Sequence, residues 1–404
     1  MSSEAQSGDP PPTPFLGLAP YLRMNIGGID LRPVGQTLLA DVQLRPDDAN
    51  LWMNLATVML CIGQHDVGMA MQAQALAMQR VFRVAAAWQP ARLRLLLLAM
   101  PGDLAANTPL DCLLEGTDIE IVFYYVTPGQ PLTEPLPEHD VVFVAISESD
   151  ANRATLNVLA QTLAHWPKPV INAPQHIPAT NRQTASELLR DAPGLLIPPT
   201  LRASRVQLEA VAGGNARLAD QFSGCDFPVI LRPLDSHAGR DLERIADAAE
   251  LASYLARVGG DEFFISPFID YSGEDGLFRK YRVALIDGAA YACHMGISAH
   301  WMIHYVNAGM YEDAGKRAEE ARFMEHFDEF ERRHHAALAA IHQRSRLDYV
   351  CIDCGETRDG RLLIFEIDHA MVVHAMDPDA LFPYKRAQMR KVRDAFRDFL
   401  LRRA

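Results

Sequence analysis

Three carboxylates in the C-terminal part of the chain, Asp353, Glu366 and Asp368, have the types and spacing that most clearly indicate chemistry. Three carboxylates that converge repel each other unless a cation lies between them. Because no His or Cys is among them, the set favours Mg²⁺, which proteins usually hold together with a nucleotide phosphate. The alternative is a surface hairpin whose acidic side chains face water.

The stretch 349–369 must bring these carboxylates together. Two apolar runs, 349–352 and 362–367, flank a polar turn centred on Asp359-Gly360, and this pattern predicts a β-hairpin. Residues two apart on a strand lie on one face, about 7 Å from each other. Two of the acids therefore share a face, and pairing across the hairpin brings the third close.

Upstream of this hairpin, four further segments follow in a recognisable order: 172–182, 227–239, 263–270 and 278–288. Together with the acidic hairpin they resemble the ATP-grasp superfamily, and most closely its branch of glutathione synthetase and ribosomal-protein glutamate ligases. The resemblance covers roughly residues 90–400. It implies an α/β chain (α+β ATP-grasp), in which a Rossmann-like pre-ATP-grasp domain precedes a two-subdomain ATP-grasp fold.

The resemblance implies that cations and a flexible lid hold the phosphates of ATP. The positions of the two usual lysines are taken by Arg182 and Arg232, which keep the charge and bind phosphate bidentately. Arg232 is also expected to be catalytic, and its alternative is a surface salt bridge. The lid contains Ser236, His237 and Gly239, with fewer glycines than the family usually has.

The resemblance also implies a hinge that binds adenine and a strand that carries catalytic cations. The hinge corresponds to Ser266, Phe268 and Ile269, which bind the base with main-chain groups and apolar side chains. Arg282 corresponds to an arginine that steadies the γ-phosphate or an acyl phosphate. Lys280 points to the same strand face and is expected at the nucleotide or on an anionic substrate, and its alternative is a solvated strand edge.

The implied reaction is the ligation of a carboxylate to an amine, with ADP and phosphate as products. ATP phosphorylates the carboxylate, and the amine then attacks the acyl phosphate. Two Mg²⁺ ions, with Mn²⁺ as an alternative, would be bridged by Glu366, with Asp353 and Asp368 as outer ligands. Asp368 departs from the family's usual asparagine. The expected substrates are an amino acid or a small peptide.

The stretch 294–307 is rich in side chains that recognise ligands, and we expect His294, His300, His304 and Asn307 to bind the organic substrate. The alternative is an aromatic core. Two of these histidines have the i, i+4 spacing of zinc ligands, but the glutamate and the third ligand of a zinc protease are absent. After the hairpin, His369 and His374 are expected either to contact the acceptor or to cap the next helix.

A helical segment is expected ahead of the part of the chain that the resemblance covers. Residues 35–88 read as helical and partly resemble one tetratricopeptide repeat through Trp52, Leu55 and Ala56. One repeat is too few for independent stability, so we expect this segment to pack on the next domain or to form a subunit interface, and a peptide-binding groove is the alternative. The expected domains are 1–34 (flexible extension), 35–88 (helical), 89–175 (pre-ATP-grasp) and 176–404 (ATP-grasp, with its hinge near 264–269).

Residues 90–175 alternate strands and helices, which predicts a parallel, doubly wound sheet. Strands are expected at 95–100, 118–125, 140–146 and 169–172, with a helix at 152–166. Ligands of such sheets bind at the carboxyl ends of strands, so Ser147–Asp150 either contacts substrate or caps the following helix. Further on, a long charged helix is expected at 315–340, with a solvated His334-His335 pair, and a closing helix at 383–403.

Composition excludes several classes of protein. A net charge of −13 argues against nucleic-acid binding. No apolar run reaches the roughly 20 residues that a membrane helix needs, and the first residues lack the features of a signal peptide. We therefore expect a cytoplasmic enzyme, with reduced cysteines and a dimer as the oligomer. Cys351 and Cys354 are expected to be buried in the hairpin, because no second pair completes a redox or zinc motif.

Two other functions remain open at this point. The chain departs from the usual family pattern at the two lysine positions, in the glycine-poor lid and at Asp368. These differences are also compatible with a catalytically impaired ATP sensor. The helical N-terminal segment is compatible with an adaptor that binds a protein partner. Retention of three converging acids argues against both, since a dead site has no use for them.

Overall fold

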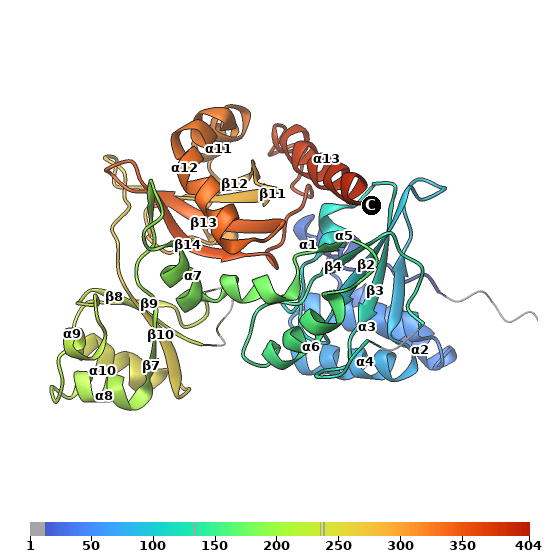
Figure 1. The fold of residues 1–404 in the computed structure, drawn as a ribbon, viewed down its shortest axis with the longest axis horizontal. Helices are drawn as coiled ribbons and strands as arrows, with labels where there is room; N and C mark the ends of the chain where they lie inside the picture. The colour runs from blue at the N-terminus through green and yellow to red at the C-terminus, as the bar shows by residue number, and fades with distance from the viewer. Residues whose placement is uncertain (1–12, 133–134, 235, 237–238) are drawn as a thin grey trace, which may run out of the picture.

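The computed structural model describes residues 13–132, 135–234, 236 and 239–404. Within these residues the strands form three sheets, and Figure 1 shows them succeeding one another along the molecule. The N-terminal helices and the first sheet lie at one end, and the four-stranded second sheet lies at the other. The C-terminal five-stranded sheet is placed between them (Figure 1).

Four helices form the N-terminal segment: α1 (Ala19–Ile26), α2 (Arg32–Leu44), α3 (Ala49–Cys61) and α4 (His65–Met78). α3 begins where the Asp48 carboxylate accepts hydrogen bonds from two backbone N–H groups. Met53, Ala75 and Leu76 are buried in one core with residues of the first sheet, so the segment packs on the next domain as expected. Residues 1–34 were expected to be a flexible extension, but the described part of this stretch contains helix α1. Residues 35–88 were expected to be helical, but the last helix ends at Met78 and strand β1 (Val81–Val84) follows. The likeness to a tetratricopeptide repeat stays a prediction.

The first sheet has the order β1-β3-β2-β4-β5, and every pair except β1–β3 is parallel. Its further strands are β2 (Leu93–Ala99), β3 (Ile119–Tyr125), β4 (Val141–Val144) and β5 (Val170–Ile171). Residues 95–98 of β2 are fully buried, because helices cover both faces of a central parallel strand. Helices α5 (Leu110–Leu113) and α6 (Arg153–Leu163) belong to this domain, and the predicted parallel sheet is confirmed.

The second sheet is small and antiparallel, in the order β7-β10-β8-β9. A short connection, η1 (Pro174–Thr180) and α7 (Arg182–Leu189), leads to it from the first sheet. Its elements are β7 (Leu201–Ser204), β8 (Val229–Pro233), β9 (Glu243–Ile245) and β10 (Glu262–Pro267), with α8 (Arg205–Ala212), α9 (Leu218–Gln221) and α10 (Ala248–Arg257). This unit has a core of its own, in which Leu231 and Phe263 are fully buried.

The third sheet has the order β12-β11-β13-β14-β6. Its strands are β6 (Leu195–Leu196), β11 (Phe278–Ile286), β12 (Ala289–Ser298), β13 (Tyr349–Glu356) and β14 (Leu362–Asp368). The predicted acidic hairpin is confirmed as β13–β14, and both cysteines of β13 are buried. The helices are η2 (Tyr305–Asn307), α11 (Ala314–Glu325), α12 (Phe327–Ser345) and α13 (Lys385–Arg403).

The expected single helix over 315–340 is wrong, because the chain forms α11 and α12 with a break at His326. The expectation that His334 is solvated is also wrong. Its side chain is buried and bonds the Glu356 carboxylate through Nε2 at 2.7 Å, a tertiary contact that local sequence does not reveal. His335 is exposed, as expected.

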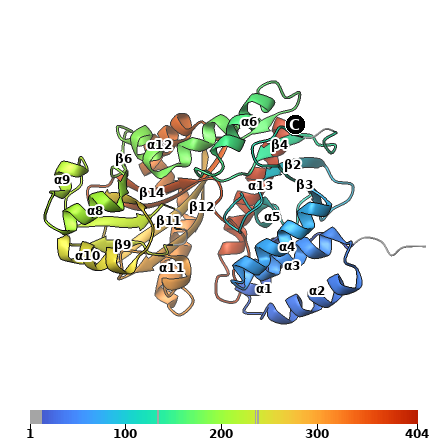
Figure 2. The same ribbon diagram turned by 90° about the horizontal axis from the view of Figure 1, so that it is seen from below.

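The C-terminal helix α13 joins the first and third sheets. The ring of Phe396 contacts Phe143 of β4, with a centroid distance of 6.1 Å, and Tyr349 of β13, with a distance of 5.0 Å. Figure 2 shows α13 running between the two parts of the molecule. The predicted fold class, a mixed α/β chain with several sheets, is confirmed. No helix among the described residues is both long and apolar enough to cross a membrane.

Candidate active site

A cavity of about 500 Å³ lies between the second and third sheets. Its volume is in the range of small-molecule sites. Twelve of the residues selected from the sequence line it: Arg182, Arg232, Gly239, Ser266, Phe268, Ile269, Lys280, Arg282, His304, Asp353, Glu366 and Asp368. Residues from α7, β8, β10, β11 and β14 therefore meet at one place although they are far apart in the chain.

Strand register places three of these charges in a row. Arg282 of β11 lies opposite Asp353 of β13, which in turn lies opposite Glu366 of β14. Directly opposed residues project from the same face of a sheet. Register shifts lie beside this row, after Arg282 in the β11–β12 ladder and after Asp353 in the β13–β14 ladder. Such irregularities re-aim side chains near functional sites.

Asp353 is the most buried member of the row, with 2% of its surface exposed. Its carboxylate accepts from Arg282 Nε at 2.8 Å and Nη2 at 3.0 Å, and it forms an ion pair with Lys280 Nζ at 2.7 Å. Burial alone raises the pKa of Asp353, but these two cations outweigh it and hold the pKa well below its ordinary value. Lys280 is thus paired with a buried carboxylate, and the alternative of a solvated strand edge is not what the structure has.

Glu366 is paired with Arg182, the first residue of α7, at a distance of 2.5 Å between Nη2 and Oε1. Burial alone raises the pKa of Glu366, but Arg182, Arg232 and Lys280 together outweigh it and lower the pKa. The pair joins α7 to β14, and both side chains line the cavity, where they face a ligand that enters it.

Arg232 differs from the other cations because no described acid pairs with it. Its side chain is buried at 8% exposure, and its Nε atom has no hydrogen-bond partner among the described residues. Burial, with a contribution from nearby Arg182, lowers the pKa of Arg232 to about 10. A buried guanidinium without a partner is unfavourable in isolation and is suited to an anionic ligand. A surface salt bridge, the alternative for this residue, is not what the structure has.

The three carboxylates line the same cavity, but they are not arranged as a ready metal cage. No group of three His, Cys, Asp or Glu side chains in the described part of the chain has the geometry to hold a metal ion. Asp353 and Glu366 are engaged by cations, while Asp368 accepts from the Ala370 N–H at 2.9 Å. Their role as Mg²⁺ ligands stays a prediction.

The hinge segment lines the cavity through Ser266, Phe268 and Ile269. The N–H of Phe268 donates to the Pro228 carbonyl at 3.0 Å and is therefore occupied. Pro267 has no N–H, so a base that enters here would find the N–H of Ile269 as the donor. The Phe268 ring lies under the Arg244 guanidinium, at 4.9 Å, and against Trp301, at 5.7 Å.

The lid is only partly described. His237 lies outside the described residues, while Ser236 is buried, donates to the Arg240 carbonyl and does not line the cavity. Gly239 has a φ of +72°, and a Cβ atom there would come within 2.3 Å of His304 Nε2. Glycine is thus required both by the backbone and by the contact between lid and loop.

The predicted substrate residues separate into two groups. His304 lines the cavity, whereas His294, His300 and Asn307 do not. His300 is exposed, and Asn307 caps its own short helix by accepting from the His304 N–H at 2.9 Å. His294 lies on β12 opposite Arg282, with its ring 4.9 Å from Tyr305 and Nδ1 buried without a partner among the described residues.

Several cavity residues were missed by sequence reasoning. Trp301, Met302 and Ile303 lie within the predicted substrate stretch 294–307 but were not selected in it, and Leu104 and Ala105 follow strand β2. The rule that ligands bind beyond the carboxyl ends of parallel strands could have found the second group. It was applied to the loop after β4 instead, where substrate contact was one of two alternatives, and that loop does not line the cavity.

Ser147–Asp150 lies outside the cavity lining. Ser149 accepts from the Asn152 N–H at 3.2 Å just before α6, whose N-terminus has no side-chain cap, and Asp150 pairs with Arg202 at 2.8 Å. The two histidines after the hairpin are also outside the lining. His369 is fully buried and bonds the Ile146 carbonyl at 3.0 Å, and His374 lines a separate pocket.

No protein-family model matches this chain, and no curated protein sequence matches it. Similar solved structures include a RimK domain protein ATP-grasp from Sphaerobacter thermophilus, with 18% identity, 76% of this chain and 99% of that chain covered, and a TM-score of 0.43. Another is the D-alanine–D-alanine ligase from Bacillus anthracis complexed with ATP, with 16% identity, 77% of this chain and 97% of that chain covered, and a TM-score of 0.45. A third is the VanG D-Ala:D-Ser ligase from Enterococcus faecalis, with 12% identity, 76% of this chain and 99% of that chain covered, and a TM-score of 0.47. Since each of these three TM-scores is below 0.5, the chemistry proposed below rests on the residues of this chain.

Proposed function

We propose that this protein is an ATP-dependent ligase of the ATP-grasp type that joins a carboxylate to an amine and releases ADP and phosphate. The observation that carries the proposal is Arg232, a buried cation without an acidic partner among the described residues, in a cavity that three further cations line. Such an arrangement is suited to a polyanion of about the size of a nucleotide.

In this proposal, ATP lies with its base against the hinge at 266–269 and its phosphates against Arg182 and Arg232. The γ-phosphoryl group passes to an oxygen of the substrate carboxylate, and ADP leaves. The amine nitrogen then attacks the carbonyl carbon, the bond from that carbon to the phosphate oxygen breaks, and the amine loses a proton. Arg282 is positioned by Asp353 to stabilise charge that develops on the transferred group.

Glu366 and Asp368 would hold Mg²⁺, with Asp353 beside them, and the ion when bound would neutralise phosphate charge. Glu366 would have to exchange its contact with Arg182 for the metal, which frees that guanidinium for phosphate. His304 and Trp301, on the side of the cavity formed by the 301–304 loop, are the side chains we assign to the organic substrate. An amino acid or a small peptide is the expected class.

The test is the release of ADP from ATP–Mg²⁺ with panels of amino acids and dipeptides, offered singly and in pairs. Hydroxylamine is added in a parallel series, because it converts an acyl phosphate into a hydroxamate that can be measured. We expect hydroxamate only with ATP and the correct carboxylate. Arg232→Met should abolish the signal, and Arg257→Met, a change at an exposed arginine of the same sheet unit, should keep it. ATP binding without ADP release under any pair would instead support the sensor function.

A further inference from the structure

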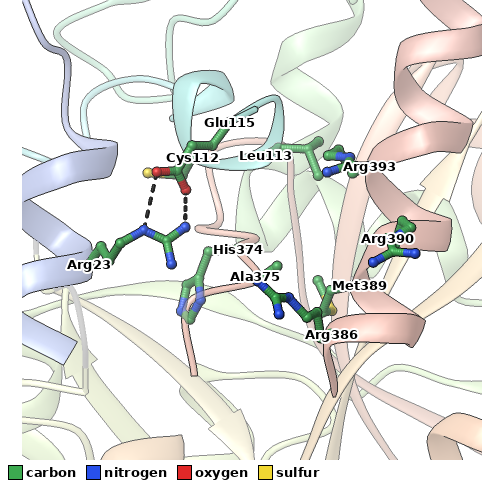
Figure 3. A pocket seen from close by; sticks show the side chains of 10 residues that line it. All are labelled: Arg23, Cys112, Leu113, Glu115, His374, Ala375, Arg386, Met389, Arg390 and Arg393. Carbon is green, nitrogen blue, oxygen red and sulfur yellow. Dashed lines mark hydrogen bonds and ion pairs between the residues drawn. The ribbon is translucent and has the colours of Figure 1, made fainter. Parts of the chain in front are cut away.

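A second pocket, of about 240 Å³, lies away from the proposed active site. Figure 3 shows its walls, which come from α1, α5, the loop after β14 and helix α13. None of its lining residues lines the larger cavity. The loop after β14 separates the two, since Val372 faces the larger cavity and His374 faces this pocket.

The pocket is rich in arginine, although the whole chain carries a net charge of −13. Arg386, Arg390 and Arg393 lie at i, i+4 and i+7 on α13 and therefore share one helix face. Arg23 of α1 faces them from the other side (Figure 3). Like charges at this helical spacing repel one another, so the cluster is unfavourable unless anions compensate it.

Compensation from the protein itself is incomplete. Arg23 pairs with Glu115 inside the pocket. Arg386 pairs with Asp379 at 3.0 Å, and Arg393 pairs with its neighbour Asp394 at 2.7 Å, but neither aspartate lines the pocket.

Arg390 has no acid or hydrogen-bond acceptor among the described residues. It is exposed on α13 and lines the pocket. Its five N–H donors are free to bind a carboxylate or phosphate bidentately.

His374 adds a neutral donor to the wall. Its Nδ1 accepts a hydrogen bond from the Met376 N–H at 3.2 Å. The ring proton is therefore on Nε2, which has no acceptor within the described part of the chain. Guanidinium groups with a histidine N–H beside them recognise oxyanions and exclude cations.

We propose that this pocket is a binding site for a small polyanion, a molecule with at least two phosphate or carboxylate groups. Its volume is about half that of the larger cavity, so it fits a ligand smaller than a nucleotide. The three arginines of the α13 wall, with His374 Nε2 beside them, can bind more than one anionic group, whereas Arg23 on the opposite wall is already paired with Glu115. The site is independent of the proposed ligase chemistry.

The test is calorimetric titration of the full-length protein with pyrophosphate and with citrate at constant ionic strength, which separates phosphate from carboxylate ligands. The titrations are run in the Arg232→Met background, so that the larger cavity contributes little phosphate binding. We expect at least one of the two probes to bind. Adding Arg390→Gln should weaken that binding at least about tenfold, since it removes a charged bidentate donor.

Lys391→Gln is the matched control, because it removes the same charge from the next, exposed residue, which lines a different pocket. It should change the affinity by less than about twofold. If both substitutions weakened anion binding equally, the effect would come from the net charge of the surface and not from this pocket, and the proposal would be overturned. Failure of both probes to bind at millimolar concentration, or unchanged binding after Arg390→Gln, would overturn it as well.

Discussion

Replacing Arg232 by methionine should make the free protein more stable while it abolishes ATP binding. The two side chains have similar volume, so packing changes little. Burial lowers the pKa of this guanidinium from 12.5 to about 10. At 1.36 kcal/mol per pH unit, this difference corresponds to about 3 kcal/mol of unfavourable free energy for the charged group in the folded protein.

The sign follows from proton linkage. The pKa is depressed in the folded state, so the folded protein disfavours the proton that the unfolded chain holds. At pH 7 both states are protonated, and the whole unfavourable contribution is present. It would be relieved only as the pH rises through about 10. Methionine removes the charge, and the free energy of unfolding should therefore rise by up to about 3 kcal/mol.

The assay is urea unfolding at pH 7 with and without ATP–Mg²⁺. For the wild type, ATP at one hundred times its dissociation constant should add about 2.7 kcal/mol. For Arg232→Met that increment should disappear. The control, Arg257→Met, replaces an exposed arginine paired with Glu243 and should change stability by less than about 0.5 kcal/mol. A less stable Arg232→Met that ATP still stabilises would refute both the burial argument and the assignment of the phosphate site.

Three further predictions address the remaining residues. Glu366→Gln should lower the rate of ADP release about 10²–10³-fold with the circular dichroism spectrum unchanged, and a near wild-type rate would contradict the role given to this carboxylate. His304→Ala should raise KM for the organic substrate roughly tenfold, whereas His300→Ala, outside the cavity lining, should leave it unchanged; equal effects would remove the loop assignment. Glu356 has a pKa below its ordinary 4.5: burial alone raises it, but His334 and Arg333 outweigh burial. Wild type should thus be more stable than Glu356→Gln above about pH 4.5, and the gap should close as the pH falls through the lower, folded-state pKa; a gap independent of pH would contradict this.

Much of the site could be predicted from the sequence because its signals are local. The acidic hairpin follows from alternation on two strands and an Asp-Gly turn. Lys280 and Arg282 were expected on one strand face, and the structure has both on the Asp353 carboxylate. Period-two geometry needs no knowledge of the rest of the chain.

The pairing partners could not be predicted, because they depend on register between distant strands. Arg282 and Asp353 are joined by the β11–β13 ladder, and the sequence does not say which acid stands opposite which cation. Burial of His334 likewise depends on how α12 packs on β13. The substrate loop was predicted as a unit, but local sequence does not distinguish His304, which lines the cavity, from the exposed His300.

Each of the two cavities is lined by an arginine that has no acidic partner among the described residues. The sequence alone does not identify which arginines these are. Arg232 and Arg390 are both unpaired among the described residues, but one is buried and the other exposed. Burial decides what each should do when it is replaced. An unpaired buried charge lowers the free energy of unfolding, so Arg232→Met should change stability and ligand binding together. An exposed guanidinium is solvated in the free protein, so Arg390→Gln should leave stability nearly unchanged and weaken anion binding alone. The two substitutions therefore distinguish a phosphate site built into the core from an anion site on the surface of the same chain.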